Sequence, residues 1–285
     1  MIYLNGQFLP LEEARVSVLD RAFLFGDGAY EFIPVYSRFP FRLKEHLRRL
    51  QATLDGLRIR NPLSDAAWTG IIETLIARNE PDDQAVYLQV TRGADTKRHH
   101  AFPEGVAPTV FIMTEPRSLP PPEQRENGVA AITAADFRWL RCDLKTTSLL
   151  ANCLLRQQAV ENGCAETILF RDGLLTEGSA SNVFMVRDGV MYAPPRSHLM
   201  LAGITCDLVL ELAQQRGLAH HLRAIREEEV RSADELWLTS STKEVLAVTT
   251  LDGLPVGSGR PGPVFKRMLG WFQEYKQTVM NRGEP

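Results

Sequence analysis

Apolar residues follow two spacings along the chain, and together these spacings predict a mixture of β-strands and α-helices. Short stretches in which apolar residues alternate with polar ones are typical of strands, while apolar residues three or four positions apart are typical of helices. Up to residue 134, strands are predicted at residues 2–9, 29–37, 85–91, 109–113 and 128–134, and helices at residues 44–57 and 65–78. The elements follow one another without a repeating period, so the pattern favours an α+β fold and excludes repeat architectures.

The second half of the chain is predicted to hold two β-hairpins between helices. Residues 167–170 and 174–176 flank one Asp-Gly pair, and residues 183–186 and 190–192 flank another. Such a pair between apolar runs is typical of a tight hairpin turn. The remaining elements are predicted as helices at residues 148–162, 205–216 and 264–279 and a strand at 235–239, with Leu149, Leu150, Cys153, Leu154 and Val160 on the apolar side of the first helix.

A proline-rich stretch divides this pattern into two parts. Residues 116–122 contain four prolines, and such a cluster is typical of a linker, because proline interrupts both helices and strands. A chain of 285 residues also lies at the length where one hydrophobic core usually splits into two. We therefore expect two α+β domains, covering residues 1–117 and 118–285.

Charge and cysteine content exclude several classes of partner. The chain has 32 Lys and Arg against 35 Asp and Glu, a net charge of −3, which predicts no nucleic acid partner and no attraction to an anionic membrane. There is no run of 18 apolar residues and no secretion signal, and the four cysteines are widely spaced. These features predict a soluble, cytoplasmic protein with reduced thiols.

Familiar cofactor and metal motifs are absent or misleading in this sequence. Residues 257–262 match the glycine pattern of dinucleotide-binding loops, but Pro261 removes a backbone donor and too few residues follow, so we expect an ordinary loop. No phosphate loop of the Walker type and no Gly-x-Ser-x-Gly elbow occurs. The six histidines lack the helical spacing of a zinc site, so no metal is expected.

Lysine is scarce in this chain, and one of its positions is unusual. Of six lysines, Lys145 alone lies at the end of a strand-like run, residues 137–144, and directly before the uncharged residues 146–153. An amine partly removed from water can act as a nucleophile. From the residues alone, a lysine whose ammonium group reaches the surface along its apolar stem is the simpler interpretation.

Seven short motifs in series carry a family resemblance. They are the segments DRAFLFGDGAYE (residues 20–31), HLRRL (46–50), TRG (91–93), RHH (98–100), RWLRCDLK (138–145), TEGSASN (176–182) and GIT (203–205). Together they resemble the class IV aminotransferases, which are pyridoxal-phosphate enzymes of fold type IV, and in particular the D-amino acid aminotransferases among them. The resemblance spans nearly the whole chain and implies a two-domain α+β architecture of fold type IV.

This resemblance implies that the cofactor is pyridoxal 5'-phosphate, held by two residues above all. Lys145 matches the lysine that binds the cofactor as a Schiff base and later moves the proton between the substrate Cα and the cofactor. Glu177 matches the carboxylate beside the ring nitrogen, where a negative charge keeps that nitrogen protonated.

The resemblance also implies the residues around the cofactor phosphate. Ile204 and Thr205 open a predicted helix, whose N-terminus favours an anion, although Thr205 is equally suited to be a simple helix cap. Arg49 matches the family's phosphate-binding arginine. The remaining expected cofactor contacts are Ser179, Ser181, Asn182, Ser240 and Ser241.

Substrate binding is implied for a second group of residues. Arg98 and His100, with Tyr30, match the residues that hold the substrate carboxylate in D-specific relatives, where the Arg-x-His pair comes from the partner protomer, so a homodimer is implied. A basic surface loop is the alternative for this pair. Phe32 and Pro34 depart from the smaller or basic residues of relatives, which leaves the side-chain pocket undefined.

The expected activity is reversible transamination between D-amino acids, such as D-alanine and D-glutamate, and 2-oxo acids, such as 2-oxoglutarate and pyruvate. It would proceed by a ping-pong mechanism through a pyridoxamine phosphate form. Three alternatives stay open: a lyase resembling aminodeoxychorismate lyase, a transaminase for (R)-amines or branched-chain L-amino acids, and a metabolite-binding protein without catalytic activity.

Overall fold

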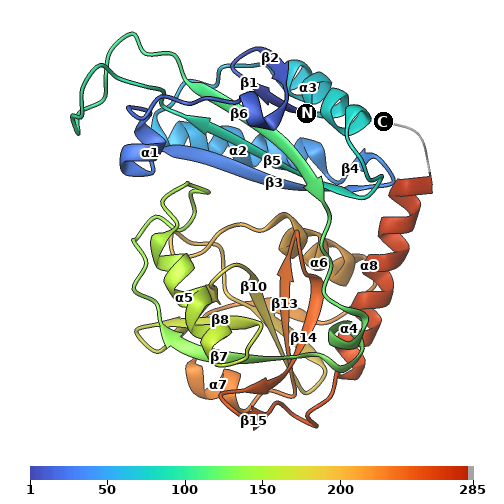
Figure 1. The fold of residues 1–285 in the computed structure, drawn as a ribbon. Helices are drawn as coiled ribbons and strands as arrows, with labels where there is room; N and C mark the ends of the chain where they lie inside the picture. The colour runs from blue at the N-terminus through green and yellow to red at the C-terminus, as the bar shows by residue number, and fades with distance from the viewer. Residues whose placement is uncertain (282–285) are drawn as a thin grey trace. The chain divides into compact units, whose positions relative to one another are not determined.

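The computed structural model describes residues 1–281, and the contacts within it divide the chain into two compact units (Figure 1). The first unit comprises Met1–Ser118 together with Leu144–Leu149, and the second comprises Leu119–Asp143 together with Leu150–Pro285. One division falls inside the proline-rich stretch. The second division does not follow from the sequence, because it assigns the short segment around Lys145 to the first unit.

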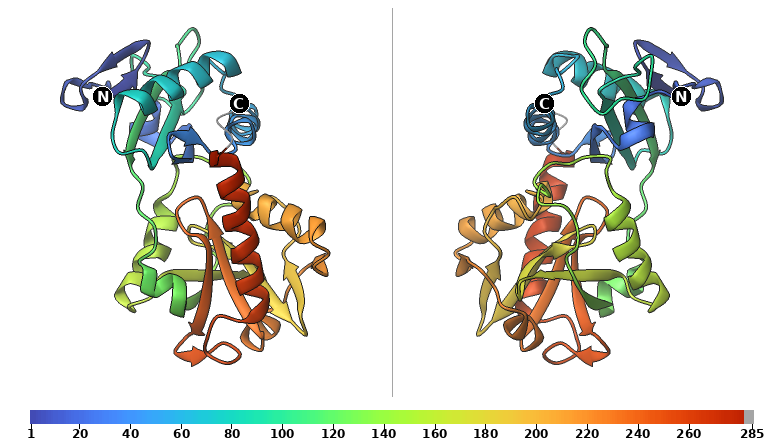
Figure 2. Two further views of the ribbon diagram at one scale, coloured as in Figure 1. Left: turned by 90° about the vertical axis from the view of Figure 1, so that its right-hand side faces the viewer. Right: turned by 90° about the vertical axis from the view of Figure 1, so that its left-hand side faces the viewer.

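The first unit is an antiparallel sheet whose two longer helices lie on one face. Its strands lie in the order β2 (Gln7–Leu9), β1 (Ile2–Leu4), β6 (Thr109–Pro116), β5 (Gln84–Thr91), β3 (Gly28–Tyr36) and β4 (Phe39–Pro40). The helices are α1 (Arg21–Phe25), α2 (Leu43–Leu57) and α3 (Asp65–Arg78), with a short 3-10 turn η1 (Leu11–Glu13). Figure 2 shows α2 and α3 side by side against the same sheet.

Alternation along the strands of the first unit separates a core face from a second face. Ile33, Leu88 and Ile112 point toward α2 and α3 and are fully buried there with Leu50 and Trp68. Because strand side chains alternate, the neighbouring residues of each strand lie on the opposite face. Tyr30, Phe32, Tyr87 and Gln89 are of this second set, and the register pairs Tyr30 with Gln89 and Phe32 with Tyr87.

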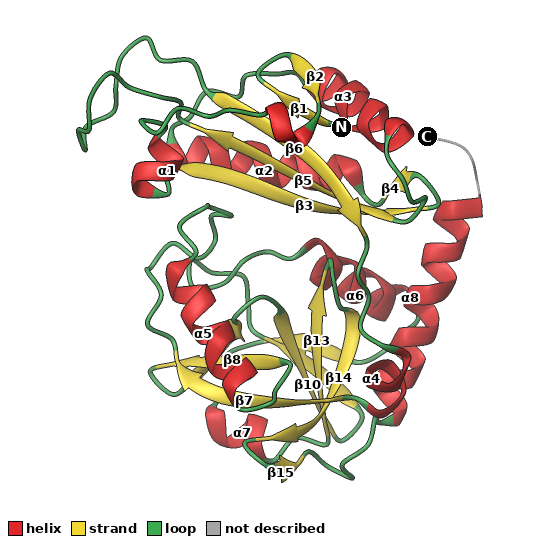
Figure 3. Ribbon diagram, viewed as in Figure 1, coloured by secondary structure: helices red, strands yellow, loops and turns green. Residues whose placement is uncertain are grey.

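The second unit is built on a long mixed sheet. Its strands lie in the order β12 (His220–Leu222), β11 (Val190–Ala193), β10 (Asn182–Arg187), β13 (Glu235–Ser240), β14 (Glu244–Leu251), β7 (Val129–Ala135), β8 (Glu166–Arg171) and β9 (Leu174–Gly178), and β15 (Leu254–Pro255) pairs with β14. The helices are α4 (Pro122–Asn127), α5 (Leu150–Glu161), α6 (Ile204–Gln215), α7 (Glu227–Arg231) and α8 (Pro263–Asn281) (Figure 3).

Both predicted hairpins are confirmed. β8 pairs with β9 and β10 pairs with β11, each antiparallel. The two residues of each turn have positive φ, with values of 51° and 74° at Asp172 and Gly173 and of 52° and 73° at Asp188 and Gly189. This is the type I′ geometry that the twist of a hairpin requires.

Several sequence predictions of local structure are wrong in detail. The strand predicted at residues 2–9 is a hairpin, since Asn5 and Gly6 form a turn between β1 and β2. Residues 137–144 are irregular rather than strand-like. The predicted apolar side of α5 is exposed, with Leu150 at 74% and Leu154 at 52%, and the helix instead buries Leu155 and Ala159. Strands β14 and β15 were not predicted.

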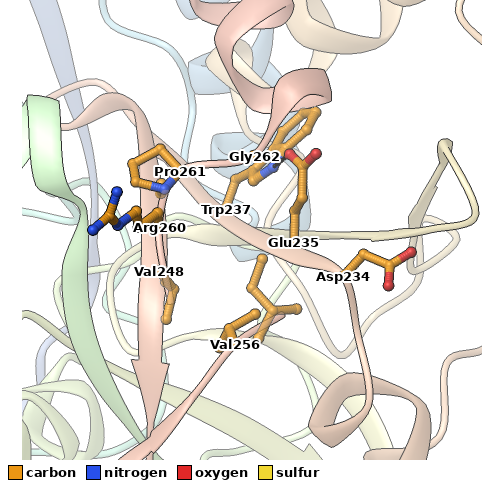
Figure 4. Close-up of a pocket in the computed structure, with 10 residues that line it drawn as sticks. Asp234, Glu235, Trp237, Val248, Val256, Arg260, Pro261 and Gly262 are labelled. Carbon is orange, nitrogen blue, oxygen red and sulfur yellow. Dashed lines mark hydrogen bonds between the residues drawn. The ribbon is translucent and has the colours of Figure 1, made fainter. Parts of the chain in front are cut away.

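Residues 257–262 form the loop that leads into α8, as predicted. The last three of them, residues 260–262, line a small pocket with Glu235 and Trp237 (Figure 4). The buried Glu235 carboxylate accepts hydrogen bonds from the backbone N–H groups of Val264 (2.9 Å) and Phe265 (2.7 Å) and from the Trp237 indole (3.1 Å). These bonds cap the first turn of α8, whose N–H groups have no partner within the helix.

Replacing Glu235 by alanine is expected to lower the free energy of unfolding by about 3 kcal/mol, because it leaves buried N–H donors without an acceptor. Glu235→Gln keeps one acceptor oxygen and is expected to cost about half as much. Urea unfolding of both variants beside an exposed control, Glu274→Ala, measures this. A loss below about 1 kcal/mol in Glu235→Ala would contradict the cap.

Within residues 1–281, no helix is long and apolar enough to cross a membrane. In the same part of the chain, no three His, Cys, Asp or Glu side chains gather where they could hold a metal ion.

Candidate active site

Lys145 lies in the short segment Leu144–Leu149, which belongs to the first unit, next to the start of β3. Its carbonyl oxygen accepts a hydrogen bond from the Tyr30 N–H (3.0 Å), and its own N–H donates to Thr53 Oγ1 (3.3 Å). The Nζ atom lies 4.2 Å from the centre of the Tyr30 ring. The backbone of Lys145 is therefore fixed on both sides, while its half-buried amine faces an aromatic ring.

Arg49 takes part in a buried charge network with Glu31, the residue that follows Tyr30 in β3. From α2, its guanidinium donates to both oxygens of Glu31, with Nε–Oε1 at 2.8 Å and Nη2–Oε2 at 2.7 Å, and His46 Nδ1 lies 2.7 Å from Oε2. Burial alone would raise the pKa of Glu31, but the positive charge of Arg49 and these hydrogen bonds hold it well below its usual range. Arg49, in the middle of α2, is thus held in place by an ionised carboxylate.

His46 adds an unsatisfied buried atom to this network. It is 1% exposed, and its Nε2 atom has no hydrogen-bond partner among the described residues. Burial lowers the pKa of His46 despite the Glu31 carboxylate beside it, which favours the neutral ring. A buried ring nitrogen without a partner is the kind of group that a bound ligand or water satisfies.

Tyr30 and Phe32 lie on the second face of the first unit's sheet, as half-buried side chains. The Tyr30 ring stacks on Tyr87, with ring centres 5.7 Å apart, and the Tyr87 hydroxyl donates to Gln89 (2.7 Å). Pro34 is buried further along the same strand. This face therefore offers aromatic surface, which suits the apolar atoms of a ligand.

Arg98 and His100 lie in the long loop between β5 and β6, which extends well beyond the strands (Figure 3). Both side chains are exposed. Among the described residues, no hydrogen bond or ion pair links either side chain to Tyr30 or Lys145. The structure therefore keeps this pair near the surface, and the carboxylate-binding role remains a prediction.

Glu177, at the end of β9, is one of two buried carboxyl groups in the second unit that bind the same arginine. Its Oε1 accepts a hydrogen bond from Arg138 Nη1 (2.5 Å), and its Oε2 accepts one from the Leu201 N–H (3.1 Å). Burial raises the pKa of Glu177 to about 7, although the Arg138 charge and hydrogen bond oppose this shift. Glu177 is therefore a buried carboxyl group balanced between its two protonation states near neutral pH.

Arg138 is shared between Glu177 and a second carboxylate. Its Nε and Nη2 atoms donate to the two oxygens of Asp136, both at 2.9 Å, and Thr176 Oγ1 donates to the same carboxylate (3.0 Å). Burial would raise the pKa of Asp136, but the Arg138 hydrogen bonds and charge lower it below its usual range. Asp136 accepts two of the Arg138 hydrogen bonds, and its negative charge raises the pKa of Glu177, against the effect of Arg138.

The N-terminus of α6 has the features of an anion site. The residue before the helix, Gly203, has no side chain that could cap the first turn. The N–H groups at Ile204 and Thr205 are therefore not capped by the residue at this position. A Cβ atom on Gly203 would lie 2.0 Å from Asn182 Oδ1, so only glycine permits this approach. Asn182 in turn donates to the Leu201 carbonyl (2.9 Å).

Ser179 and Ser181 both bind a carboxylate that the sequence analysis did not single out. Glu166 is fully buried and accepts hydrogen bonds from the Ser179 N–H (3.1 Å), the Ser179 hydroxyl and the Ser181 hydroxyl (2.6 Å). Lys243 Nζ lies 3.2 Å from the same carboxylate. Burial opposes ionisation, but the Lys243 charge and these donors lower the pKa of Glu166. The two hydroxyls therefore serve to fix the turn after Glu177.

Ser240 and Ser241 lie in the turn between β13 and β14. The Ser240 hydroxyl accepts a hydrogen bond from the Lys243 N–H (3.0 Å) and lies 3.2 Å from the Thr242 hydroxyl. Ser241 is half-buried, and its side chain has no hydrogen bond among the described residues. Since Lys243 pairs with Glu166, this turn and the Ser179–Ser181 turn share one ionic anchor.

Sequence reasoning missed several charged residues in these networks, among them Glu31, Arg138 and Glu166. Two of them lie inside the family motifs, but a motif does not say which of its members pair with each other. A buried charge must be paired, so its partner decides its role, and these partners are 18, 39 and 77 residues away. No local pattern could have found Glu166.

Comparison with known proteins adds a family and relatives. The family model described as amino-transferase class IV matches residues 28–251. The chain is similar to the D-alanine aminotransferase of Bacillus licheniformis, with 42% identity over 94% of each chain. It is also similar to that of Staphylococcus aureus (strain MW2), with 35% identity over 97% of this chain and 98% of the relative.

Solved structures point to the same fold but carry another substrate name. The structure of the branched-chain amino acid aminotransferase of Escherichia coli matches with a TM-score of 0.89 and 28% identity, over 96% of this chain and 93% of that one. The T.th. branched-chain amino acid aminotransferase with pyridoxamine 5'-phosphate matches with a TM-score of 0.89 and 29% identity, over 99% of this chain and 94% of that one.

Proposed function

Because this chain belongs to the class IV aminotransferase family and is an aminotransferase, we propose that it transfers amino groups between D-amino acids and 2-oxo acids. The observation that carries the choice of D-amino acids is the similarity to D-alanine aminotransferases over nearly the full length of both chains. D-alanine and D-glutamate are the proposed donors, and pyruvate and 2-oxoglutarate the proposed acceptors.

The residues of this chain fit pyridoxal 5'-phosphate, which when bound accepts the electrons released at the substrate Cα. The half-buried amine of Lys145 suits its aldehyde, and the uncapped start of α6 at Ile204 and Thr205 suits its phosphate. Arg49 is proposed as a further phosphate ligand, with Ser240 and Ser241. Ser179, Ser181 and Asn182 are proposed to shape the wall of the site around Glu177.

Two side chains are proposed to move or hold protons. Lys145, once released from the cofactor, would carry a proton between the substrate Cα and the cofactor carbon. Glu177 would hold the proton on the ring nitrogen as a carboxylate, because the positive charge of that nitrogen would counteract the rise that burial causes in the pKa of Glu177. Arg138 keeps the Glu177 side chain in one orientation through its bond at 2.5 Å.

Arg98, His100 and Tyr30 are proposed to bind the substrate carboxylate, and Phe32 with Pro34 to line the side-chain pocket. In D-specific relatives the Arg-x-His pair comes from the partner protomer, so we propose a homodimer. Exposure of both side chains in a single chain supports this. All four cysteines are free, which supports a cytoplasmic location.

A branched-chain L-amino acid transaminase is a second candidate. Structural similarity to such enzymes at 28% and 29% identity supports it. The aromatic face around Tyr30 and Phe32 would also accept an aliphatic side chain. Activity with L-leucine and none with D-alanine would identify this candidate.

The test of the proposed function is the visible spectrum of the purified protein loaded with pyridoxal 5'-phosphate. D-alanine without an acceptor is expected to remove the absorption band of the lysine-bound cofactor, and 2-oxoglutarate is expected to restore it. L-alanine serves as the matched control and should leave the band unchanged. A band that responds to L-alanine or L-leucine, but not to D-alanine, would overturn the D-amino acid assignment.

A further inference from the structure

The loop that carries Arg98 and His100 is fixed by a buried arginine. Arg21, at the start of α1, is 4% exposed, and its guanidinium donates to three consecutive carbonyl groups of the loop. Nη1 lies 2.6 Å from the His99 oxygen and 3.3 Å from that of Ala101, and Nη2 lies 3.2 Å from that of His100. One side chain therefore holds the main chain of residues 99–101.

The Arg21 guanidinium is itself anchored by Asp27. Its Nε donates to Asp27 Oδ2 (2.7 Å), and Arg92 donates to both oxygens of the same carboxylate (2.8 and 2.9 Å). Burial raises the pKa of Asp27, but the hydrogen bonds and charges of both arginines lower it overall, so the anchor stays ionised. One carboxylate shared by two arginines leaves positive charge beside the loop, which favours an anion.

A phenylalanine ring contacts both members of the pair. The Arg98 guanidinium carbon lies 5.0 Å from the centre of the Phe25 ring, and the His100 ring centre lies 5.3 Å from it. Arg21 lies 4.8 Å from the same ring centre. Phe25 therefore restrains two side chains that would otherwise be free to rotate on an exposed loop.

We propose that Arg21 is a positioning residue, which together with Phe25 holds the loop and the Arg98 and His100 side chains in the arrangement that binds the substrate carboxylate. This inference rests on the proposed function. It goes beyond it because neither residue needs to touch the substrate. Arg21 acts by bonding to the loop backbone, and Phe25 acts by its contacts with the two side chains.

Lysine cannot replace arginine in this role. The planar guanidinium presents donors in several fixed directions, so it reaches three carbonyls and Asp27 at once, whereas an ammonium group is a single compact donor. Arg21→Lys therefore keeps the charge beside Asp27 but releases part of the loop. This makes it a test of geometry rather than of charge.

Arg92→Lys is the matched control. Arg92 pairs with the same Asp27, and its guanidinium carbon lies 3.6 Å from the centre of the Phe102 ring, which is 6.0 Å from that of Arg21. Its remaining donors hold the carbonyls of Leu57 and Arg58 at the end of α2. The two variants lose a similar buried arginine in the same unit. Only Arg21→Lys removes donors from the carbonyl groups of residues 99–101.

The kinetic readout compares D-alanine with D-alaninamide, which keeps the amino group and Cα but lacks the carboxylate charge. In the enzyme loaded with pyridoxal 5'-phosphate, Arg21→Lys is expected to lower kcat/KM for D-alanine roughly tenfold to a hundredfold. The kcat/KM for D-alaninamide should stay unchanged. Arg98→Ala gives the full effect of losing the carboxylate site. Equal losses for both substrates, or no change in their ratio, would overturn the proposal.

Limited proteolysis by trypsin gives a readout that does not depend on activity. Cleavage after Arg98 is expected to be roughly tenfold faster in Arg21→Lys than in Arg92→Lys, because only the former loses hydrogen bonds to the carbonyl groups of residues 99–101. Equal cleavage rates in the two variants would overturn the proposal.

Phe25→Leu covers the case in which the Arg21 variant does not fold. Phe25 is half-buried at the end of α1, so leucine should be tolerated there, and Phe23→Leu on the same helix is its control, since Phe23 is 75% exposed. The preference for D-alanine over D-alaninamide should fall in Phe25→Leu and not in Phe23→Leu. The reverse result would contradict the role of Phe25.

Failure of this proposal differs from failure of the proposed function. If the wild-type cofactor band does not respond to D-alanine, the D-amino acid activity is wrong, whatever the variants do. If the wild type responds but Arg98→Ala keeps its preference for D-alanine, the carboxylate site lies elsewhere, and the role given to Arg21 is overturned with it.

Discussion

Replacing Lys145 by alanine is expected to reduce transamination on the order of 10⁴-fold, the upper end of what one proton-transferring group contributes. In the proposed mechanism this amine both binds the cofactor aldehyde and moves the proton, so no other group can replace it. The structure supports a local effect, since the Lys145 backbone is fixed by Tyr30 and Thr53 independently of the side chain. The free energy of unfolding should therefore change little.

Two measurements separate loss of chemistry from loss of structure in Lys145→Ala. Borohydride reduction should leave the cofactor covalently attached to the peptide containing Lys145 in the wild type and unattached in the variant. A small primary amine added to the solution should restore part of the activity, because it can supply the missing base. Lys266→Ala, at an exposed lysine of α8, is the control. More than about 1% residual turnover in Lys145→Ala would contradict the assignment.

Local periodicity predicted those elements whose buried face can be recognised from the spacing of their own apolar residues. Residues 65–78 form α3 as predicted, because Ser64 caps the helix and one face meets the core. The two Asp-Gly turns also fixed their hairpins locally. By contrast, β14 is buried along nearly its whole length, and a continuous apolar run has no period that separates strand from helix.

The buried face of α5 shows a second limit. Leu150 and Leu154 are four positions apart, and so are Leu155 and Ala159, so both pairs have the spacing of an apolar helix face. Packing against β8 decides which of the two faces is buried. The same holds for charges. Family motifs pointed to Lys145 and Glu177, but the pairing of Glu177 with Arg138, and of Glu166 with Lys243, depends on distant strands meeting. Such contacts are properties of the fold, not of any segment.

Replacing Glu177 by glutamine is expected to lower transamination roughly 10²- to 10³-fold, the usual loss when one buried electrostatic contact to the reacting group is removed. The amide has nearly the same shape and can still accept a hydrogen bond from Leu201. It cannot carry the negative charge that keeps the cofactor's ring nitrogen protonated. Cofactor binding should weaken much less than turnover. A variant with more than about half of the wild-type turnover would contradict this role.

The same substitution has a pH signature in the cofactor-free protein. Burial raises the pKa of Glu177 from 4.5 to about 7 in the folded state, so between these values the folded protein holds a proton that the unfolded chain releases. The stability that Glu177 contributes is therefore fully present below pH 4.5 and is lost as the pH rises through 7, a change of about 3 kcal/mol. Urea unfolding at pH 4.5 and 7.5 should show this decrease in the wild type relative to Glu177→Gln.

Glu166→Gln is the control for this pH effect, because it removes another buried carboxylate of the same unit whose pKa is lowered rather than raised. A group of that kind contributes stability above its unfolded-state pKa, and the contribution is lost only as the pH falls through its lower folded-state pKa. The difference between wild type and Glu166→Gln should therefore stay nearly constant from pH 5 to 7.5, while the difference for Glu177→Gln decreases. If both differences were flat, Glu177 would be ionised throughout, since the Arg138 pair would outweigh burial. The carboxyl group would then act on the cofactor as a fixed negative charge rather than as a group that shares its proton.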